Sequence, residues 1–333
     1  MENPVLVEIV RGAVVESRHR GAVAVVDGDG KIVMQIGDID RPTFPRSAVK
    51  AIQALPLIES GAADAFGFGN KELALACASH SAEAGHVETA RFMLKQAGLS
   101  EADLECGAHW PFDQPMVIDF ASHGVKPLAV HNNCSGKHAG FLCTGCHEGI
   151  DLKGYVSAGH KIQDHVRDVM QAVTGAAHDS DQCGTDGCSI PTFAIPLKDI
   201  AHGFALMTTG VGFSRERASA ATRLLNACMA EPWHVAGTDR ACTELMRAAP
   251  NRVFAKVGAE GVYCAAIPEL GLGIALKCDD GSSRGCETMV AGVISKLFGK
   301  DDASETFGKL ARKPMSNWNK IEYGMSRPAG LLA

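Results

Sequence analysis

The feature that most constrains the fold is the separation of strand-like and helix-like patterns along the chain. Apolar runs over 5–10, 22–26 and 32–36, the last two joined by Asp27-Gly28-Asp29-Gly30, predict a β-hairpin region. Strand patterns return near the other end, over 252–257, 261–267 and 271–277. Between these ends, apolar residues recur with helical spacing. The sequence therefore predicts an α+β fold, in which both termini form one antiparallel sheet and a helical region is inserted between them.

The helical region is continuous, with no linker of biased composition to mark a boundary. Helices are expected over 47–59, 72–81, 83–96, 136–147, 158–173, 197–207, 215–229, 239–248 and, after the last strand, 284–297. We therefore predict one catalytic unit over 1–333, with its sheet in about 1–45 and 250–333 and its helical region in about 46–249.

Charge and hydropathy exclude several classes of partner. The chain has 38 acidic and 32 basic residues in no obvious blocks, a net charge of -6, which gives no footprint for nucleic acid or anionic membrane. The segment Met1-Glu2-Asn3-Pro4 lacks the basic and apolar regions of an export signal, and no long apolar stretch occurs. We expect a cytoplasmic protein that acts on a small molecule, with its twelve cysteines reduced.

The first candidate site is the segment Pro45-Arg46-Ser47-Ala48-Val49-Lys50, which leads from a proline-rich loop into a helix. Ser47 falls in the first turn, where free N–H groups and the helix dipole stabilise a developing anion, and Lys50 lies three residues on, on the same face. A buried lysine can lose its proton and act as the base for a serine nucleophile. The bland alternative is a capping serine with a surface lysine. The proline-stiffened start and the apolar helix favour the catalytic interpretation, as in serine β-lactamases.

Two polar loops carry the second candidate site. Cys134 lies in His131-Asn132-Asn133-Cys134-Ser135-Gly136-Lys137-His138, and Cys188 lies in Cys183-Gly184-Thr185-Asp186-Gly187-Cys188. Two thiolates with a third donor from Lys137 or His138 would make a three-ligand zinc site with an open position. Chemistry alone favours His138, because a lysine must shed its proton before it coordinates a metal. The alternative is that these are two unrelated loop cysteines.

Together, these segments resemble the rhizobial-type L-asparaginases. The resemblance extends over most of the chain, and further segments that carry it are Ala78-Ser79-His80-Ser81 and Lys256-Val257-Gly258-Ala259-Glu260-Gly261. It implies a fold like that of the serine β-lactamases and glutaminases, a homodimer, and hydrolysis of L-asparagine to aspartate and ammonia through an acyl-enzyme. The Lys256-Val257-Gly258 segment has valine where the β-lactamase class has threonine, and the Ser-Asp-Asn element of that class is missing.

The resemblance also implies roles for individual residues. Ser47 pairs with Lys50 and Ser79 with Lys256 as two catalytic Ser-Lys tandems. Cys134, Lys137 and Cys188 are the implied zinc ligands, with the zinc aiding substrate binding rather than the attack. The Ser47 N–H and a strand N–H near Gly258 are expected to hold the oxyanion. Arg46, His138 and Asp186 are polar residues that adjoin these motifs, and they are expected to grip either the amino and carboxylate groups of the substrate or a zinc-bound water.

Other functions stay open at the level of the sequence. A glutaminase or a β-lactam-directed hydrolase on the same fold is one alternative, since a methylene contributes only about 1–3 kcal/mol of discrimination. A non-enzymatic zinc- or redox-responsive cytoplasmic protein is another, built on Cys134, Cys188 and the Cys143/Cys146 pair.

Overall fold

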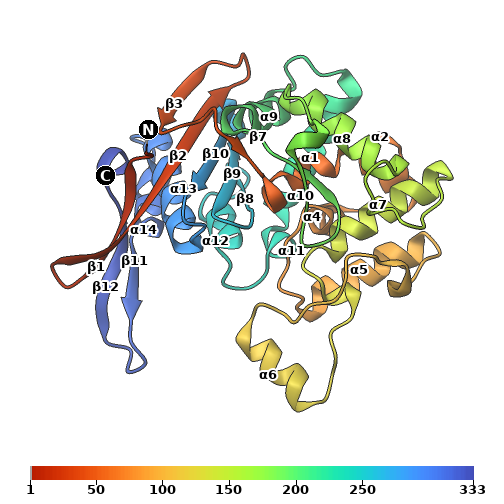
Figure 1. The fold of residues 1–333 in the computed structure, drawn as a ribbon, viewed down its shortest axis with the longest axis horizontal. Helices are drawn as coiled ribbons and strands as arrows, with labels where there is room; N and C mark the ends of the chain where they lie inside the picture. Colours follow the sequence, from red (N-terminus) through yellow and green to blue (C-terminus); the bar gives the residue numbers. More distant parts are fainter. Residues whose placement is uncertain (1) are drawn as a thin grey trace.

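The computed structural model describes residues 2–333 and confirms the α+β expectation (Figure 1). The described residues form an eight-stranded antiparallel sheet in the order β11-β12-β1-β2-β10-β9-β8, with β3 also paired to β2. Its strands are β1 (Val5–Arg11), β2 (Val14–Asp27), β3 (Ile32–Ile36), β8 (Phe254–Val257), β9 (Val262–Ile267), β10 (Leu272–Cys278), β11 (Lys313–Ser316) and β12 (Glu322–Pro328). The first strand pairs with the last, with Val7 opposite Pro328, so both ends of the chain do build the sheet.

Helices fill the middle of the chain, as predicted, and two more follow β10. They are α1 (Lys50–Gln53), α2 (Leu55–Glu59), α3 (Ala62–Ala65), α4 (Asn70–Ala76), α5 (Ala84–Gln96), α6 (Gln114–Ser122), α7 (Ser135–Glu148), α8 (Lys161–Thr174), α9 (Leu197–Thr209), α10 (Arg215–Ala230), α11 (Pro232–Val235), α12 (Ala241–Ala248), α13 (Ser283–Phe298) and α14 (Asp302–Leu310). Short 3-10 turns join them, of which η1 (Arg46–Val49) matters for the site. Two small strand pairs, β4 (Pro42–Thr43) with β7 (Ile195–Pro196) and β5 (Cys183–Thr185) with β6 (Pro191–Phe193), lie in the same region.

Helices cover both faces of the sheet. On one side of β10, Gly273 leaves α9 room to approach, because a Cβ there would collide with the backbone of Ala201. Cys278, five residues further along β10, faces α13, since a Cβ on Gly285 would lie 2.6 Å from its sulfur. Side chains an odd number of positions apart point to opposite faces of a strand. The sheet is therefore the middle layer between α9 and α13.

The expected helix over 47–59 is wrong in one respect, because the structure divides it. The 3-10 turn η1 comes first, α1 follows, and α2 begins at Leu55 with Pro56 in its first turn. Proline has no N–H to donate to the preceding turn, so the segment bends there. The expected helix over 72–81 also ends early, at Ala76, and the residues after it run without helix as far as Glu83.

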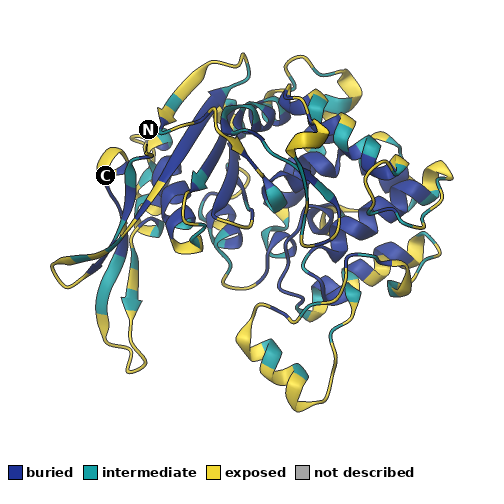
Figure 2. Cartoon of the chain, viewed as in Figure 1, coloured by how far each residue is buried: buried dark blue, intermediate teal, exposed yellow. Residues whose placement is uncertain are grey.

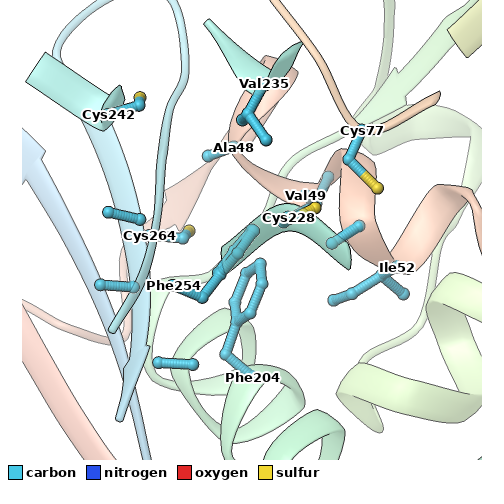
Figure 3. Close-up of a cluster of buried hydrophobic side chains, with 14 of the residues drawn as sticks. Ala48, Val49, Ile52, Cys77, Phe204, Cys228, Val235, Cys242, Phe254 and Cys264 are labelled. Carbon is cyan, nitrogen blue, oxygen red and sulfur yellow. The ribbon is translucent and has the colours of Figure 1, made fainter. Parts of the chain in front are cut away.

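A continuous apolar core lies beneath the turn that carries Ser47 (Figures 2 and 3). Ala48 and Val49 are buried, and Ile52 of α1 points toward Phe204 of α9 in the close-up. Phe204 stacks on Phe254 of β8 with 5.6 Å between ring centroids. The residues that flank Ser47 are thus held from below by both the helical region and the sheet.

Among residues 2–333, no helix combines the length and the apolar character needed to span a bilayer.

Candidate functional site

Ser47 sits in a strained turn pressed against the end of the sheet. The residue before it, Arg46, has φ +52°, an uncommon conformation for a residue with a side chain. Gly258, directly after β8, packs onto this turn so closely that a Cβ would lie 2.6 Å from the Pro45 carbonyl oxygen. Only glycine permits this approach. The turn and the strand end are therefore fixed relative to each other.

Beside this turn, three buried side chains form a hydrogen-bonded chain, which we call the Lys-Ser-Lys relay: Lys50, Ser79 and Lys256. The Ser79 Oγ accepts from Lys50 Nζ at 3.0 Å and from Lys256 Nζ at 2.8 Å. Both lysines are 0% exposed and Ser79 is 5% exposed. Lys50 also donates to the Ala78 carbonyl and, at 3.1 Å, to the Cys134 sulfur. Residues from three distant parts of the sequence therefore meet in one network.

Of the two lysines in the relay, Lys256 is the one whose pKa is lowered to near physiological pH. Burial lowers the pKa of Lys256 to about 7, and the charges of Lys50 and Arg240 act in the same direction. Burial disfavours the ammonium because it removes water from around the charge. At pH 7 a substantial fraction of Lys256 can therefore accept a proton.

Ser47 is not hydrogen-bonded to the relay. The sequence predicted that Lys50 would face Ser47, but within residues 2–333 the Ser47 hydroxyl makes no hydrogen bond, and Lys50 points to Ser79 instead. Ser47 and Ser79 nevertheless line the same cavity, which has a volume of about 720 Å³. Its wall also includes Ser81, Glu83, Phe112, Asp113, Met116, Asn133, Thr238, Asp239, Arg240, Val257, Gly258, Ala259, Ser283 and Glu287.

Two backbone N–H groups that are free within the described chain lie at the cavity, one of Ser47 and one near Gly258. The Gly258 N–H donates to the Val262 carbonyl at 2.7 Å, so it is occupied. Within residues 2–333, the N–H groups of Ser47 and of Ala259, the residue after Gly258, donate to no acceptor. Two unused N–H groups beside a candidate nucleophile can hold an oxyanion. The Ala259 N–H is thus the free donor near Gly258 in the described residues.

The two predicted thiol ligands meet in the structure. A hydrogen bond from the Cys188 thiol, helped by the charges of Lys50 and Lys137, lowers the pKa of Cys134 well below its ordinary value against the effect of burial. The same hydrogen bond raises the pKa of Cys188. Lys137 Nζ lies 3.0 Å from the Cys188 sulfur. Two buried sulfurs therefore lie together, with the Lys137 amine beside one of them, and paired thiolates are typical zinc ligands.

His138, the other candidate for the third ligand, is held differently. Its Nδ1 lies 2.7 Å from the Tyr155 hydroxyl, and its Nε2 is buried with no hydrogen-bond partner within residues 2–333. Burial, followed by the charges of Lys137 and Lys50, lowers the pKa of His138 well below its ordinary value, so the ring is neutral. Lys137 is the residue in contact with a thiol, and its role as a ligand stays a prediction.

Of the residues predicted to grip the substrate, Arg46 and Asp186 contact each other, and His138 is fully buried. Arg46 forms an ion pair with Asp186, with Arg46 Nη2 2.7 Å from Asp186 Oδ1. Burial raises the pKa of Asp186, but the charges of Lys137 and Arg46 outweigh burial and hold this pKa below its ordinary value. Neither these two residues nor His138 is among those that line the cavity. Their assignment to substrate binding stays a prediction, and the ion pair positions the strained turn before Ser47.

The second cysteine pair is inert in the structure. Cys143 lies 3.4 Å from the Met93 carbonyl oxygen, and Cys146 lies 3.8 Å from that of Ala97. Burial raises the pKa of Cys143 to about 12 and also raises that of Cys146. Thiols in this state react slowly, which weakens the non-enzymatic redox alternative.

Sequence reasoning missed the charged part of the cavity wall. Glu83 and Arg240 come from segments with no motif, and Glu83 binds Thr238 through two hydrogen bonds of 2.8 and 2.7 Å. A left-handed conformation at Asp239, with φ +56°, marks this loop only once coordinates exist. No periodicity or spacing pointed to it.

Comparison with known proteins gives one match over nearly the whole chain. The model of the family described as L-asparaginase II matches residues 7–328. A search of curated protein sequences found no match.

Several solved structures are similar at low sequence identity. Mglu in its native form is 16% identical with a TM-score of 0.43, covering 90% of this chain and 68% of its own. A beta-lactamase from Mycobacterium bovis is 13% identical with a TM-score of 0.43, covering 84% of this chain and 94% of its own. A mutant of simvastatin synthase from Aspergillus terreus is 10% identical with a TM-score of 0.39, covering 86% and 90%. No residue role follows from likenesses of this size.

Proposed function

The chain belongs to the L-asparaginase II family, and from that premise we propose that it hydrolyses the side-chain amide of L-asparagine to L-aspartate and ammonia. The observation that supports a serine mechanism most directly is the buried Lys-Ser-Lys relay at a cavity that Ser47 also lines. A lysine with a pKa of about 7 is a suitable general base at neutral pH.

Of Ser47 and Ser79, Ser47 is the better nucleophile. An attacking hydroxyl needs a free lone pair, and the Ser79 oxygen already accepts from both Lys50 and Lys256. The Ser47 hydroxyl has no such partner within residues 2–333, and its own N–H is unused. Ser79 is instead placed to pass protons between the lysines. The proposal requires Ser47 to form a hydrogen bond with the relay when substrate binds, which is how catalytic hydrogen bonds often form.

The proposed cycle has two steps. Ser47 attacks the amide carbon while the relay takes its proton, and the N–H groups of Ser47 and Ala259 hold the oxyanion. The relay then gives the proton to the departing nitrogen, which leaves as ammonia with formation of a β-aspartyl ester. In the second step a water molecule gives its proton to the relay as it attacks this ester. Release of aspartate returns the proton to Ser47.

Cys134, Lys137 and Cys188 fit a zinc ion by donor type and by proximity, and we propose them as its ligands. Zinc bound there would neutralise the thiolates and stabilise the loops beside the cavity, which supports substrate binding. Lys50 donates to Cys134, so the ligand cluster contacts the relay directly. We also propose a homodimer, on the resemblance alone, and a cytoplasmic location, on the sequence pattern alone.

We expect turnover to fall as the pH drops below neutral. The pKa of Lys256 is lowered to about 7, so below this value the lysine becomes protonated and cannot accept the Ser47 proton. The turnover number at saturating asparagine should fall roughly tenfold per pH unit below 7 and be level above about pH 8. A turnover number that stays level down to pH 5 would contradict a role for Lys256 as base.

Removal of zinc should affect binding more than turnover. Metal-free protein is prepared with a chelator and checked by elemental analysis. Its KM for asparagine should be roughly tenfold or more above that of the zinc-loaded protein, with turnover reduced but not lost. Cys188→Ala should behave likewise, and it is a cleaner probe than Cys134→Ala because Cys134 also contacts Lys50. Complete inactivity that only zinc restores would argue for a metal-bound nucleophile instead.

One experiment tests the proposed function against its alternatives. Purified protein is incubated separately with L-asparagine, L-glutamine and a penicillin, and ammonia or ring opening is measured. Ammonia from asparagine supports the proposal. Preference for glutamine or the penicillin would favour a glutaminase or a β-lactam-directed hydrolase. No turnover of any of the three, with an oligomeric state that changes with zinc or thiol oxidation, would favour the non-enzymatic alternative.

A further inference from the structure

The cavity wall holds a single cationic side chain, Arg240, among four carboxylate residues, Glu83, Asp113, Asp239 and Glu287. Arginine in a protein normally finds a carboxylate, and here four are nearby. Within residues 2–333, however, no carboxylate lies within 4.0 Å of the Arg240 guanidinium. Its one side-chain hydrogen bond is long, 3.4 Å to the Ser81 hydroxyl. The guanidinium therefore faces the cavity with most of its donors unused.

The loop that carries Arg240 is fixed before any ligand arrives. Glu83 binds both the N–H and the hydroxyl of Thr238, and the Trp233 indole N–H donates to the same hydroxyl at 3.0 Å. Gly237 has φ +121° and no space for a side chain, because a Cβ would lie 2.6 Å from a Glu83 oxygen. Arg240 is the N-cap residue directly before α12. These contacts hold the arginine backbone in place and also keep Glu83 away from its guanidinium.

Arg240 is also close to the reacting groups. Its Nη1 contacts Ser81, two residues after Ser79, and two extended residues span at most about 7 Å. Its charge is one of those that lower the pKa of Lys256. In asparagine, three C–C bonds of about 1.5 Å each separate the α-carboxylate carbon from the amide carbon. A carboxylate bound to Arg240 therefore leaves the amide carbon near Ser79, in the cavity that Ser47 also lines.

We propose that Arg240 is the binding site for the α-carboxylate of the substrate, so that the cavity selects free α-amino acid amides over simple amides. The inference rests on the proposed function, because it assigns a role within the same reaction. Arginine presents a planar fork that matches a carboxylate with two parallel hydrogen bonds. The surrounding carboxylates favour the α-ammonium of the same ligand. A zwitterionic amino acid thus matches the charges of the wall.

The test compares two amides that differ only in the α-carboxylate, L-asparagine and 3-aminopropanamide. Arg240→Gln should lower kcat/KM for asparagine about 100-fold, mostly through KM, because a charge-assisted pair loses one partner. For 3-aminopropanamide, kcat/KM should change less than about threefold. If this amide is turned over too slowly, its inhibition constant against asparagine hydrolysis is measured instead, with the same expectation. Arg240→Lys should lie between, since it keeps the charge and loses the fork. Arg247→Gln, an exposed arginine on the same helix, is the matched control and should change neither amide.

A binding measurement separates this proposal from the proposed function. By calorimetry, L-aspartate should bind the wild-type protein about 100-fold more tightly than it binds Arg240→Gln, whereas β-alanine, which lacks the α-carboxylate, should bind both equally. Wild-type protein that releases no ammonia but shows this pattern would refute the asparaginase proposal and keep the carboxylate site. Equal losses for both amides and both binding ligands, or no loss for any, would overturn the role of Arg240. Far-ultraviolet circular dichroism checks that each variant is folded.

Discussion

Ser47→Ala is expected to remove asparagine hydrolysis, with a fall in kcat/KM on the order of 10⁴- to 10⁶-fold, as is found when a catalytic serine is deleted. Ser79 is not expected to form the ester in its place, because its oxygen already accepts hydrogen bonds from two lysines. The fold should be unaffected. The Ser47 hydroxyl makes no hydrogen bond within residues 2–333, so its loss costs at most about 0.5–2 kcal/mol of stability. Ammonia release and thermal unfolding measure the two effects.

Two serine variants control this result. Ser283→Ala removes an exposed hydroxyl from the same cavity wall and should leave activity unchanged. Ser79→Ala should slow turnover by interrupting the relay while leaving measurable hydrolysis. An active Ser47→Ala protein beside an inactive Ser79→Ala protein would reverse the two roles and identify Ser79 as the nucleophile.

Lys50→Met and Lys256→Met are each expected to lower turnover by roughly two to four orders of magnitude. Both lysines are fully buried and bind the same Ser79 oxygen, so each variant breaks the same proton path. The double variant should therefore be little worse than either single one, as is typical of residues that act as a unit. Single-turnover kinetics on the four proteins gives the coupling between the two sites.

Stability distinguishes this loss from simple unfolding. Methionine is close to lysine in size and needs no hydrogen bonds, so Lys256→Met should leave the melting temperature unchanged or raise it. Lys296→Met, on the exposed surface of α13, is the matched control and should retain full activity. Effects of Lys50→Met and Lys256→Met that multiply in the double variant would contradict a shared relay.

The sequence predicted the parts of the fold whose apolar pattern is strong. The buried strands β8, β9 and β10 and most of the longer helices were expected close to their observed bounds, whereas α14 was not expected. The strands β11 and β12 and the first half of β2 were missed, because their residues are largely exposed and carry little apolar periodicity. Helix α6 was missed for a related reason, since it buries no residue. Prediction thus failed where burial does not restrict residue type.

The candidate site was only partly predictable for a different reason. The motifs identified Lys50, Ser79, Lys256 and the two thiol loops, and the structure brings these side chains together. Which serine each lysine contacts depends on side-chain direction, which spacing alone does not determine. Arg240 could not be found at all, because its significance lies in the absence of a nearby carboxylate, a property of three-dimensional arrangement.

The pairing of β1 with β12 and the 177-residue separation of Ser79 from Lys256 have a consequence for the order of events during synthesis. A ribosome adds about 5–20 residues per second, so Lys256 is made roughly 9–35 s after Ser79. The helical middle can pack during that interval, because many of its contacts are local. The outer edge of β1 must wait for β12, the last strand of the sheet. An unpaired strand edge invites pairing with other chains, so the nascent protein is most exposed to aggregation until its final strand leaves the ribosome.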